Sequence, residues 1–504
     1  MTSSVFPHRV AMPVAATPKI VFATFAIILA LKLGVLAVFG PASQPDTYSY
    51  VRYADAILSG EFQHVDLNDP MPVTLTRVIG FPAIIAVAKF VFGRDWAVAV
   101  VLLQFAVSLC ASVMVYRLAR AFRLGVWLSL GIVTAHATSM QFVADQAVLT
   151  DSLCGSTMTL ATCILGLIAL RSRSASLTIY LGTGVLIAIA FLIRDVVAFL
   201  SLGLIPLAVT AAMAEQSVRR RIMACALIYL PLIATNIAYR EWNRTRVGAP
   251  IVTSVAQAAV FGALIEAAQY DETIFSGSSP LDIIGRLILP KVKKERWGYE
   301  QEISEFLHRE YGWDAVRMSR ESTIAYLHGW RDHPYAMIRH MLFHMSEQQL
   351  HQAVRPIETV RDVILWNTGK GSDLARERAV RAGNWWQIPA VLANWIVMTI
   401  SVFVFVAFVV VTPIRLIREG WNAETGVSIG IWCYYMAVGW LYAAVHLEPR
   451  YLTPVVAGSI VVGVVNIVRV IEHFRGAERQ QANMARPRRL RSHESQDGRD
   501  VRHL

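Results

Sequence analysis

Two acidic residues stand where apolar runs begin, in positions from which they could move a proton. Asp46 precedes a helical pattern, and Asp151 opens a long apolar run. A carboxylate can take a proton from a substrate hydroxyl, and two carboxylates could also share a divalent cation. Each residue has a structural explanation as well, because an acid at a helix start bonds the first free amides and complements the helix dipole. The spacing leaves both explanations open for both residues.

Three arginines lie at similar boundaries. Arg77 is part of RVIGFP, Arg194 lies between two apolar runs in FLIRDV, and Arg450 lies in HLEPRYLTP. The planar, permanently charged guanidinium suits a phosphate ligand. The alternative is an anchor at the lipid boundary, with the charged end turned toward water.

The last motif carries further polar groups. Tyr451 follows Arg450 directly, and His446 or Glu448 could orient that arginine. We therefore predict that His446, Arg450 and Tyr451 contribute to substrate binding. Two arginine-bearing junctions are harder to explain as simple anchors than one.

The composition excludes an ordinary soluble protein. Of 504 residues, 55% are hydrophobic and only 16% are charged. Several apolar runs reach the roughly 20 residues that cross a bilayer. Spanning segments in lipid must satisfy their own backbone hydrogen bonds. The sequence therefore predicts an all-α polytopic membrane protein, and the net charge of +11 needs no nucleic acid to explain it.

The apolar runs and the arginine clusters between them predict the topology. The runs lie near 20–40, 79–93, 96–116, 126–142, 153–170, 177–193, 196–213, 222–239, 389–412, 427–446 and 451–468. The run 79–93 contains Lys89 and spans only about 20 Å, short of a hydrocarbon core roughly 30 Å thick. If it lies at the surface, about ten crossings remain, and both termini and every arginine cluster fall on the cytoplasmic side.

The opposite, outer face then receives the candidate chemistry. Asp46, Asp145, Asp151, Arg194 and Arg450 all fall on it. We expect a membrane module over 1–240, an external domain over 241–388, helices over 389–470 and a basic cytoplasmic tail over 471–504. Within the first module, the loop 41–77 carries a surface helix that has Asp46 at its leading end, an apolar face that begins at Tyr50, and an end at Gly60.

No metal site is predicted in the external domain. His340, His344, Glu347 and His351 follow a helical spacing that could bind zinc, but no H-E-x-x-H pattern is present and the residues between them are typical of packing. The tryptophans of the domain are available for sugar stacking or interfacial anchoring: Trp297, Trp313, Trp330, Trp385 and Trp386. The five cysteines lie in or beside apolar runs, so no disulfide framework is expected.

The order of these motifs resembles the GT-C superfamily of membrane glycosyltransferases, in particular the group of protein mannosyltransferases and lipid A aminoarabinose transferases. The motifs are D-x-x-x-Y-x-x-x-A-x-x-x-L-x-G from Asp46, then RVIGFP, TDSL, LIRD and a final H-x-x-x-RY. The resemblance implies a GT-C-like bundle with two juxtamembrane helices and a polyprenyl-phosphate sugar donor. It also implies Asp46 as the catalytic acid/base residue, Asp151 as a second acidic residue of the site, and donor phosphate contacts from Arg194 and Arg450.

The expected function is sugar transfer from that donor to a hydroxyl of a cell-envelope glycolipid, glycan or protein, with inversion, at the periplasmic face of a bacterial inner membrane. We assign catalysis to Asp46 and Asp151, and substrate binding to Arg77, Arg194, His446, Arg450 and Tyr451. The motifs establish no cofactor, and a divalent cation that the carboxylates could share is the one candidate. The alternatives are a transporter or flippase for lipid-linked sugars, and an assembly protein without chemistry. A transporter would favour charges near the bilayer centre and broken helices in paired halves.

Overall fold

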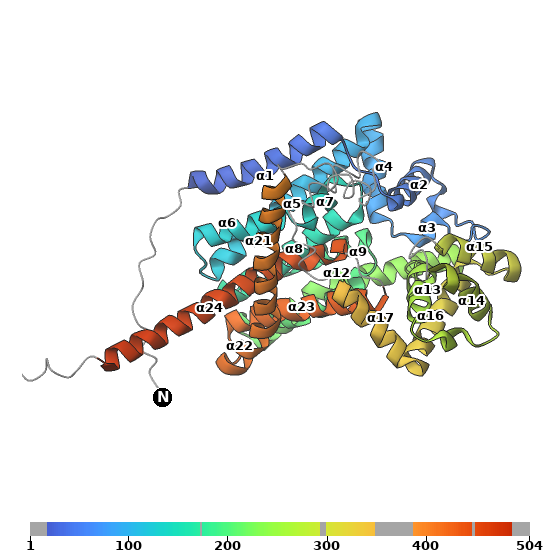
Figure 1. The fold of residues 1–504 in the computed structure, drawn as a ribbon. Helices are drawn as coiled ribbons and strands as arrows, with labels where there is room; N and C mark the ends of the chain where they lie inside the picture. Colours follow the sequence, from blue (N-terminus) through green and yellow to red (C-terminus); the bar gives the residue numbers. More distant parts are fainter. Residues whose placement is uncertain (1–17, 172–173, 293–298, 348–386, 446–448, 486–504) are drawn as a thin grey trace, which may run out of the picture.

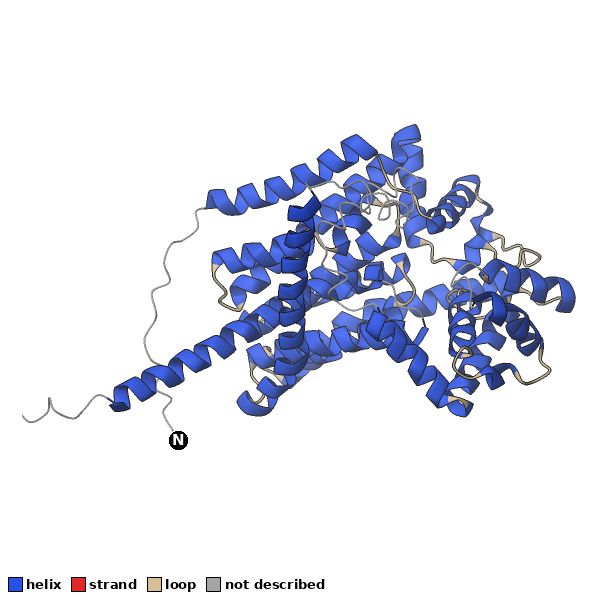
Figure 2. Cartoon of the chain, in the orientation of Figure 1, coloured by secondary structure: helices blue, strands red, loops and turns tan. Residues whose placement is uncertain are grey.

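The computed structural model describes residues 18–171, 174–292, 299–347, 387–445 and 449–485. These residues form helices and connecting loops, and they contain no strand (Figure 2). A single parallel bridge joins Ala42 to Ala147. The prediction of an all-α polytopic membrane protein is confirmed.

Within the described residues, seven helical segments are long and apolar enough to cross a membrane. The helices that form them are α1 (Pro18–Phe39), α4 (Gly80–Phe92) with η2 (Gly93–Asp95) and α5 (Trp96–Ala121), α8 (Thr150–Arg171), α12 (Val218–Val247), α21 (Gln387–Val406) with η5 (Ala407–Val411) and α22 (Thr412–Glu419), α23 (Ala423–Val445), and η6 (Pro449–Leu452) with α24 (Thr453–Ala485).

The described part of the chain thus has seven segments that could cross, or eight with one bent pair, against the about ten crossings that the sequence predicted. Helices α6 (Val126–Ala137) and α7 (Met140–Gln146) meet at a bend of 49° and count as an eighth span if taken together. Two shorter apolar segments are α9 (Leu177–Ile193) and the run formed by α10 (Val197–Leu200), η3 (Ser201–Leu204) and α11 (Ile205–Met213).

The loop after α1 folds into short helices. They are α2 (Pro45–Ser59), η1 (Glu61–Gln63), α3 (Val73–Thr76), α4 (Gly80–Phe92) and η2 (Gly93–Asp95). Helix α2 packs on α4 through the edge-to-face rings of Tyr50 and Phe81, whose centroids are 5.2 Å apart. Gly93, with φ of 55°, interrupts the apolar stretch that runs from α4 into α5. Helices α4 and α5 together form one apolar segment of 42 residues, Gly80–Ala121, so a surface position for 79–93 stays a prediction.

Helix α2 follows the predicted pattern with two differences. It starts at Pro45, so that Asp46 lies inside its first turn and not just before the helix, and it is closed by Gly60, whose φ of 80° suits glycine. Tyr53 is fully buried on the apolar face. Leu58, expected on that face, is 47% exposed because it lies in the last turn.

The long segment after α12 forms a helical unit with its own core, which we call the inserted domain (residues 256–347). Its helices are α13 (Ala256–Ala267), η4 (Glu272–Phe275), α14 (Pro280–Val292), α15 (Glu300–Tyr311), α16 (Ala315–Asp332) and α17 (Pro334–Glu347). Phe261, Ile288 and Leu307 are among the buried residues of that core.

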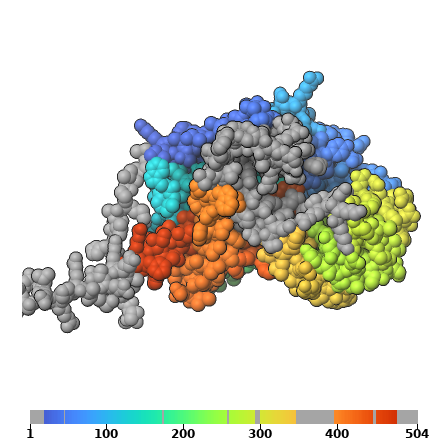
Figure 3. All heavy atoms as spheres, viewed as in Figure 1, coloured from blue at the N-terminus to red at the C-terminus, as the bar shows by residue number. Residues whose placement is uncertain are grey.

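The inserted domain lies at the same end of the molecule as α2 and α3. The beginning of α1 and the far end of α24 lie at the opposite end (Figure 1). The space-filling view in Figure 3 shows the domain as a separate mass at that end. The bundle therefore presents the first loop and the inserted domain on one side.

Candidate functional site

A cavity of about 2520 Å³ lies where the first loop, the helix ends and the inserted domain meet. Six of the seven predicted site residues line it: Asp46, Arg77, Asp151, Arg194, Arg450 and Tyr451. They come from four separate stretches of the chain. The seventh, His446, lies outside the described residues, as does its neighbour Glu448.

Asp46 is held by two arginines. It lies in the first turn of α2, behind Pro45, and the helix start is closed instead by the backbone N–H of Gln44, which donates to Thr47 Oγ1 at 2.9 Å. Asp46 therefore does not serve as the N-cap. Its Oδ1 accepts from Arg77 Nη2 at 2.8 Å and its Oδ2 from Arg450 Nη2 at 3.4 Å.

Thr47 fixes this helix start against the bundle. Its hydroxyl donates to the carbonyl of Val148 at 3.0 Å, and Val148 N–H donates to the carbonyl of Ala42 at 3.0 Å. Because Val148 comes just before α8, these bonds tie the loop of Asp46 to the helix that begins with Asp151. The two carboxylates thus reach one cavity through backbone contacts that the sequence pattern did not suggest.

Arg77 is positioned by the glycine three residues later. A Cβ at Gly80 would lie 2.5 Å from the carbonyl oxygen of Leu192 near the end of α9. Glycine therefore lets the start of α4 approach the helix end that carries Arg194. Arg77 itself donates to Ser49 Oγ at 3.2 Å and lies over the ring of Tyr50, 5.0 Å from its centroid.

Asp151 and Arg194 form a close ion pair. The side chain of Asp151 is 4% exposed and that of Arg194 is 19% exposed. Asp151 also accepts through its carbonyl from Thr453 Oγ1 at 3.4 Å, and Thr453 lies against Gly155. The contact partner of Asp151 is therefore Arg194, and this pair connects the start of α8 to the end of α9.

Arg194 lies beside two stacked tyrosine rings. Its guanidinium is 4.3 Å from the ring centroid of Tyr451 and 5.7 Å from that of Tyr442. The two tyrosine rings stack at 4.7 Å. Burial alone would lower the pKa of Arg194, but Tyr442 and Asp151 raise it, and the net direction is upward. The guanidinium therefore stays charged in the cavity.

Arg450 links the two ion pairs. It contacts Asp46, lies 5.3 Å from the ring centroid of Tyr451, and its Nη2 is 3.5 Å from the tyrosine oxygen. The contacts thus run from Arg77 through Asp46, Arg450 and Tyr451 to Arg194. These residues, far apart in the sequence, therefore meet in one cavity, and their roles in catalysis and binding stay predictions.

Asp145 does not belong to this group. It is fully buried and forms an ion pair with Lys32 of α1, which is also fully buried. Lys32 donates to Ser108 at 3.0 Å, and Asp145 accepts from Gln141 at 2.6 Å. A charged pair shut inside the bundle fastens α1 to α7, and the expectation that Asp145 lines the outer site is wrong.

The tryptophans do not line the cavity where the structure describes them. Trp313 is 5% exposed in the core of the inserted domain, and Trp330 packs against the cores of both the domain and the bundle. Of the two alternatives for these residues, sugar stacking in this cavity is therefore not available to Trp313 and Trp330. Trp297, Trp385 and Trp386 lie outside the described residues. Tyrosines line the cavity instead: Tyr48, Tyr50, Tyr229, Tyr299, Tyr326, Tyr442 and Tyr451.

Sequence reasoning missed Tyr442 and the use of Asp195. Tyr442 lies near the end of an apolar run that gives no sign of which face meets the cavity. Asp195 accepts from the hydroxyl of Thr253 at 2.5 Å, a residue 58 positions away. In the sequence, the motif FLIRDV shows only that Asp195 follows Arg194, and it does not reveal the contact with Thr253.

One wall of the cavity is apolar and open. It is formed by residues of α10, η3, α11 and α12 that line the cavity and are more than 40% exposed: Phe199, Leu202, Ile205, Val209, Ile233 and Ile237. We call this set the apolar groove. It continues from the charged residues along helices of the membrane bundle.

No protein-family model and no curated protein matches the chain. Among solved structures, the crystal structure of ArnT from Cupriavidus metallidurans bound to undecaprenyl phosphate is similar. It is 14% identical, the match covers 90% of this chain and 79% of that chain, and the TM-score is 0.34. A likeness of this degree carries no argument, and the interpretation of the site depends on its geometry.

Proposed function

We propose that the chain is a membrane glycosyltransferase that moves a sugar from a polyprenyl-phosphate donor to an acceptor hydroxyl at the outer face of the membrane. One observation carries the proposal. A large cavity brings a reachable carboxylate and three arginines next to an exposed apolar groove. A lipid with an anionic head and a long hydrocarbon chain has this combination of charge and apolar surface.

The arginines supply the phosphate site. Arg194 and Arg450 face Tyr451 from one side of the cavity, and their planar charged groups suit phosphate oxygens. A phosphate bound at Arg450 would compete with Asp46 Oδ2 for the same guanidinium. The contact between Asp46 Oδ2 and Arg450 Nη2 is long, 3.4 Å, so a phosphate could displace it. Phosphate binding would thereby free Asp46 Oδ2 to accept a proton.

Asp46 supplies the base. It takes the proton of the acceptor hydroxyl as the hydroxyl oxygen attacks the anomeric carbon. The bond from that carbon to the phosphate oxygen breaks, and its electron pair stays on the departing lipid phosphate, whose growing charge the arginines stabilise. A single displacement inverts the anomeric centre. The side chain of Asp46 is 36% exposed, so an acceptor can reach it.

Asp151 acts in this scheme by holding Arg194, since its carboxylate is buried against that guanidinium. Arg77 holds the other oxygen of Asp46 in the same way. The acceptor would enter between the first loop and the inserted domain. We propose a hydroxyl-bearing glycolipid, glycan or protein of the cell envelope as the acceptor, and the periplasmic side of the inner membrane as the location of the reaction.

The test measures whether the bond between the sugar and the phosphate of the donor is broken. Purified chain is reconstituted in vesicles with polyprenyl-phosphate sugars labelled in the sugar, together with lipid and glycan acceptors. The proposal predicts labelled acceptor and free polyprenyl phosphate in equal amounts. A transporter or flippase would move intact donor across the bilayer without releasing polyprenyl phosphate, and that result would reject the proposal.

A further inference from the structure

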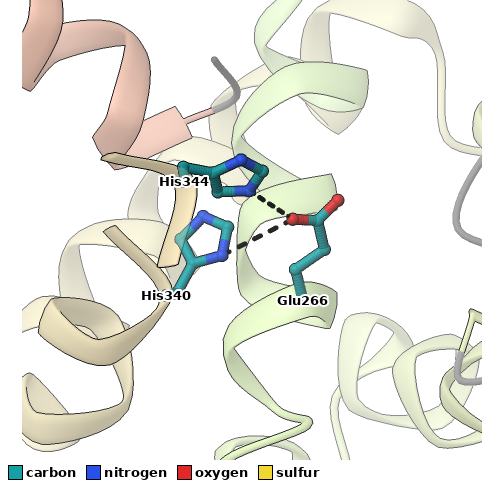
Figure 4. A group of neighbouring side chains, drawn as sticks. All are labelled: Glu266, His340 and His344. Atoms are coloured by element: carbon teal, nitrogen blue, oxygen red, sulfur yellow. Dashed lines mark hydrogen bonds and ion pairs between the residues drawn. The ribbon is translucent and has the colours of Figure 1, made fainter. Parts of the chain in front are cut away.

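Three potential metal ligands converge where the inserted domain meets the bundle (Figure 4). His340 and His344 lie one turn apart on α17, and Glu266 approaches them from α13. His344 Nε2 is 2.7 Å from Glu266 Oε2, and His340 Nδ1 is 3.5 Å from the same oxygen. The ligand atoms of the three residues all lie within 4.8 Å of one another.

The sequence spacing explains why both imidazoles point the same way. Residues four apart on a helix share a face, and this is the spacing of the two histidines in H-E-x-x-H zinc sites. Here the acidic residue comes from another helix, 74 positions before His340, so no motif in the sequence reveals it. The expectation that this row of residues serves only packing overlooked Glu266.

The burial favours a ligand set over a chance surface cluster. His340 is 1% exposed and His344 is 4% exposed. A hydrogen bond between one histidine and the glutamate would explain a single buried imidazole. Instead, one ring nitrogen of each histidine, His340 Nδ1 and His344 Nε2, is directed at the same carboxylate oxygen (Figure 4), as ligands around a common centre would be.

The donor set and its dimensions select the metal. Two imidazole nitrogens and one carboxylate oxygen form a ligand set that zinc uses, with bonds of about 2.0–2.2 Å. In a tetrahedron with such bonds, two ligand atoms lie roughly 3.3 Å apart. Glu266 Oε2 lies 2.7 Å from His344 Nε2 and 3.5 Å from His340 Nδ1, which brackets that value. Side-chain movements of less than about 1 Å would therefore suffice to bring the three ligand atoms to zinc distances.

An ion at this position would connect two helices, α13 and α17, where the inserted domain packs against the bundle. On α17, Met337 belongs to the core of the inserted domain and Met341 to the core of the bundle. Glu266, on the facing helix, lines the large cavity. An ion bound by the three residues would therefore fasten α17 to α13 at the edge of the cavity, with its remaining coordination position reached from the side of Glu266.

We propose that Glu266, His340 and His344 bind one zinc ion that fastens the inserted domain beside the cavity. None of the three residues has a part in the proposed transfer reaction, so zinc binding can be tested independently of that reaction.

The test measures zinc directly. The full chain in detergent is loaded with zinc, dialysed against metal-free buffer and analysed for metal by mass spectrometry. We expect about one zinc ion per chain in the wild type. We expect at least about a tenfold lower content in Glu266→Ala, His340→Ala and His344→Ala, because each loses a ligand. His328→Ala removes an exposed histidine of the same domain and should keep the wild-type content.

A second measurement covers variants that fail to fold. Wild-type chain loaded with cobalt should show the visible absorption of a four-coordinate ion bound by histidine and glutamate. Adding a chelator should remove that absorption. Wild-type chain that retains less than about one tenth of a zinc ion, or ligand variants that fold and keep the wild-type zinc content, would overturn the proposal.

Discussion

At the residue scale, the aromatic ring beneath Arg194 is the feature with the clearest measurable consequence. The guanidinium is 4.3 Å from the centroid of Tyr451. Such a contact away from water is worth about 1–2 kcal/mol, which corresponds to roughly tenfold in binding. Replacing Tyr451 by Leu should therefore raise the KM for the donor about tenfold and change kcat little.

Tyr451→Phe is the matched control for this prediction. It keeps the ring under Arg194 and removes only the hydroxyl, whose contact with Arg450 is a long 3.5 Å. Donor KM should stay close to the wild-type value. If Phe proves as harmful as Leu, the hydroxyl and not the ring face matters at this position.

The residues of the site could be predicted from the sequence only in part. Asp46, Arg194 and Arg450 stand out because a charge at the edge of an apolar run needs an explanation, and all three line the cavity. Tyr442 gives no such signal, since a tyrosine in an apolar run is ordinary. Asp145 gives the same signal as Asp46 yet pairs with Lys32 inside the bundle, because a charge pattern does not reveal its partner.

At the scale of elements, Gly80 sets the distance between the first loop and α9. Gly80→Ala would bring a Cβ to 2.5 Å from the Leu192 carbonyl oxygen, and backbone cannot move aside cheaply. We expect a loss of about 1–3 kcal/mol in stability, measured by thermal unfolding in detergent. Gly182→Ala, on the same α9 with nothing within 4 Å of its Cβ, should be neutral or stabilising. Equal effects of the two substitutions would refute the packing argument.

The buried pair of Lys32 and Asp145 fastens α1 to the bundle. Removing one partner leaves an uncompensated charge in the interior, which costs about 3–5 kcal/mol. Lys32→Met alone should therefore destabilise the protein strongly, and adding Asp145→Asn should restore much of the loss. Lys89→Met breaks a pair whose Asp55 is 58% exposed, and should cost less than about 1 kcal/mol. A double variant no more stable than Lys32→Met would contradict this account.

Elements were more predictable than their contacts. The apolar runs predicted about ten crossings, of which seven or eight are long and apolar enough in the described residues, and Gly60 and Gly93 marked helix ends that the structure has. Whether Asp46 caps α2 could not be decided from the sequence, because Gln44 and Thr47 close the helix start with bonds that depend on the tertiary position of Val148. The core of the inserted domain likewise lies between helices whose sequence patterns do not specify their partners.

At the scale of the whole molecule, the apolar groove should receive the hydrocarbon chain of the donor. Leu202 lines the cavity and is 58% exposed. Leu202→Trp should fill part of the groove and raise the KM for long-chain donors, while a donor with a much shorter chain is affected less. The measurement is turnover against donor chain length.

Ile189→Trp is the matched control for the groove. Ile189 is 43% exposed on α9 but does not line the cavity. Turnover should be unchanged at every chain length. If both tryptophans act alike, or if Leu202→Trp affects all donors equally, the donor chain does not lie in the groove.

The most direct measurement is the release of polyprenyl phosphate by the Asp46→Asn variant. A general base contributes about 10²–10⁴ to the rate, so release should fall at least about 100-fold in a variant that inserts and purifies as the wild type does. Asp55→Asn, an exposed acid on the same helix, should release polyprenyl phosphate at the wild-type rate. Release by Asp46→Asn within about threefold of the wild type would contradict the account.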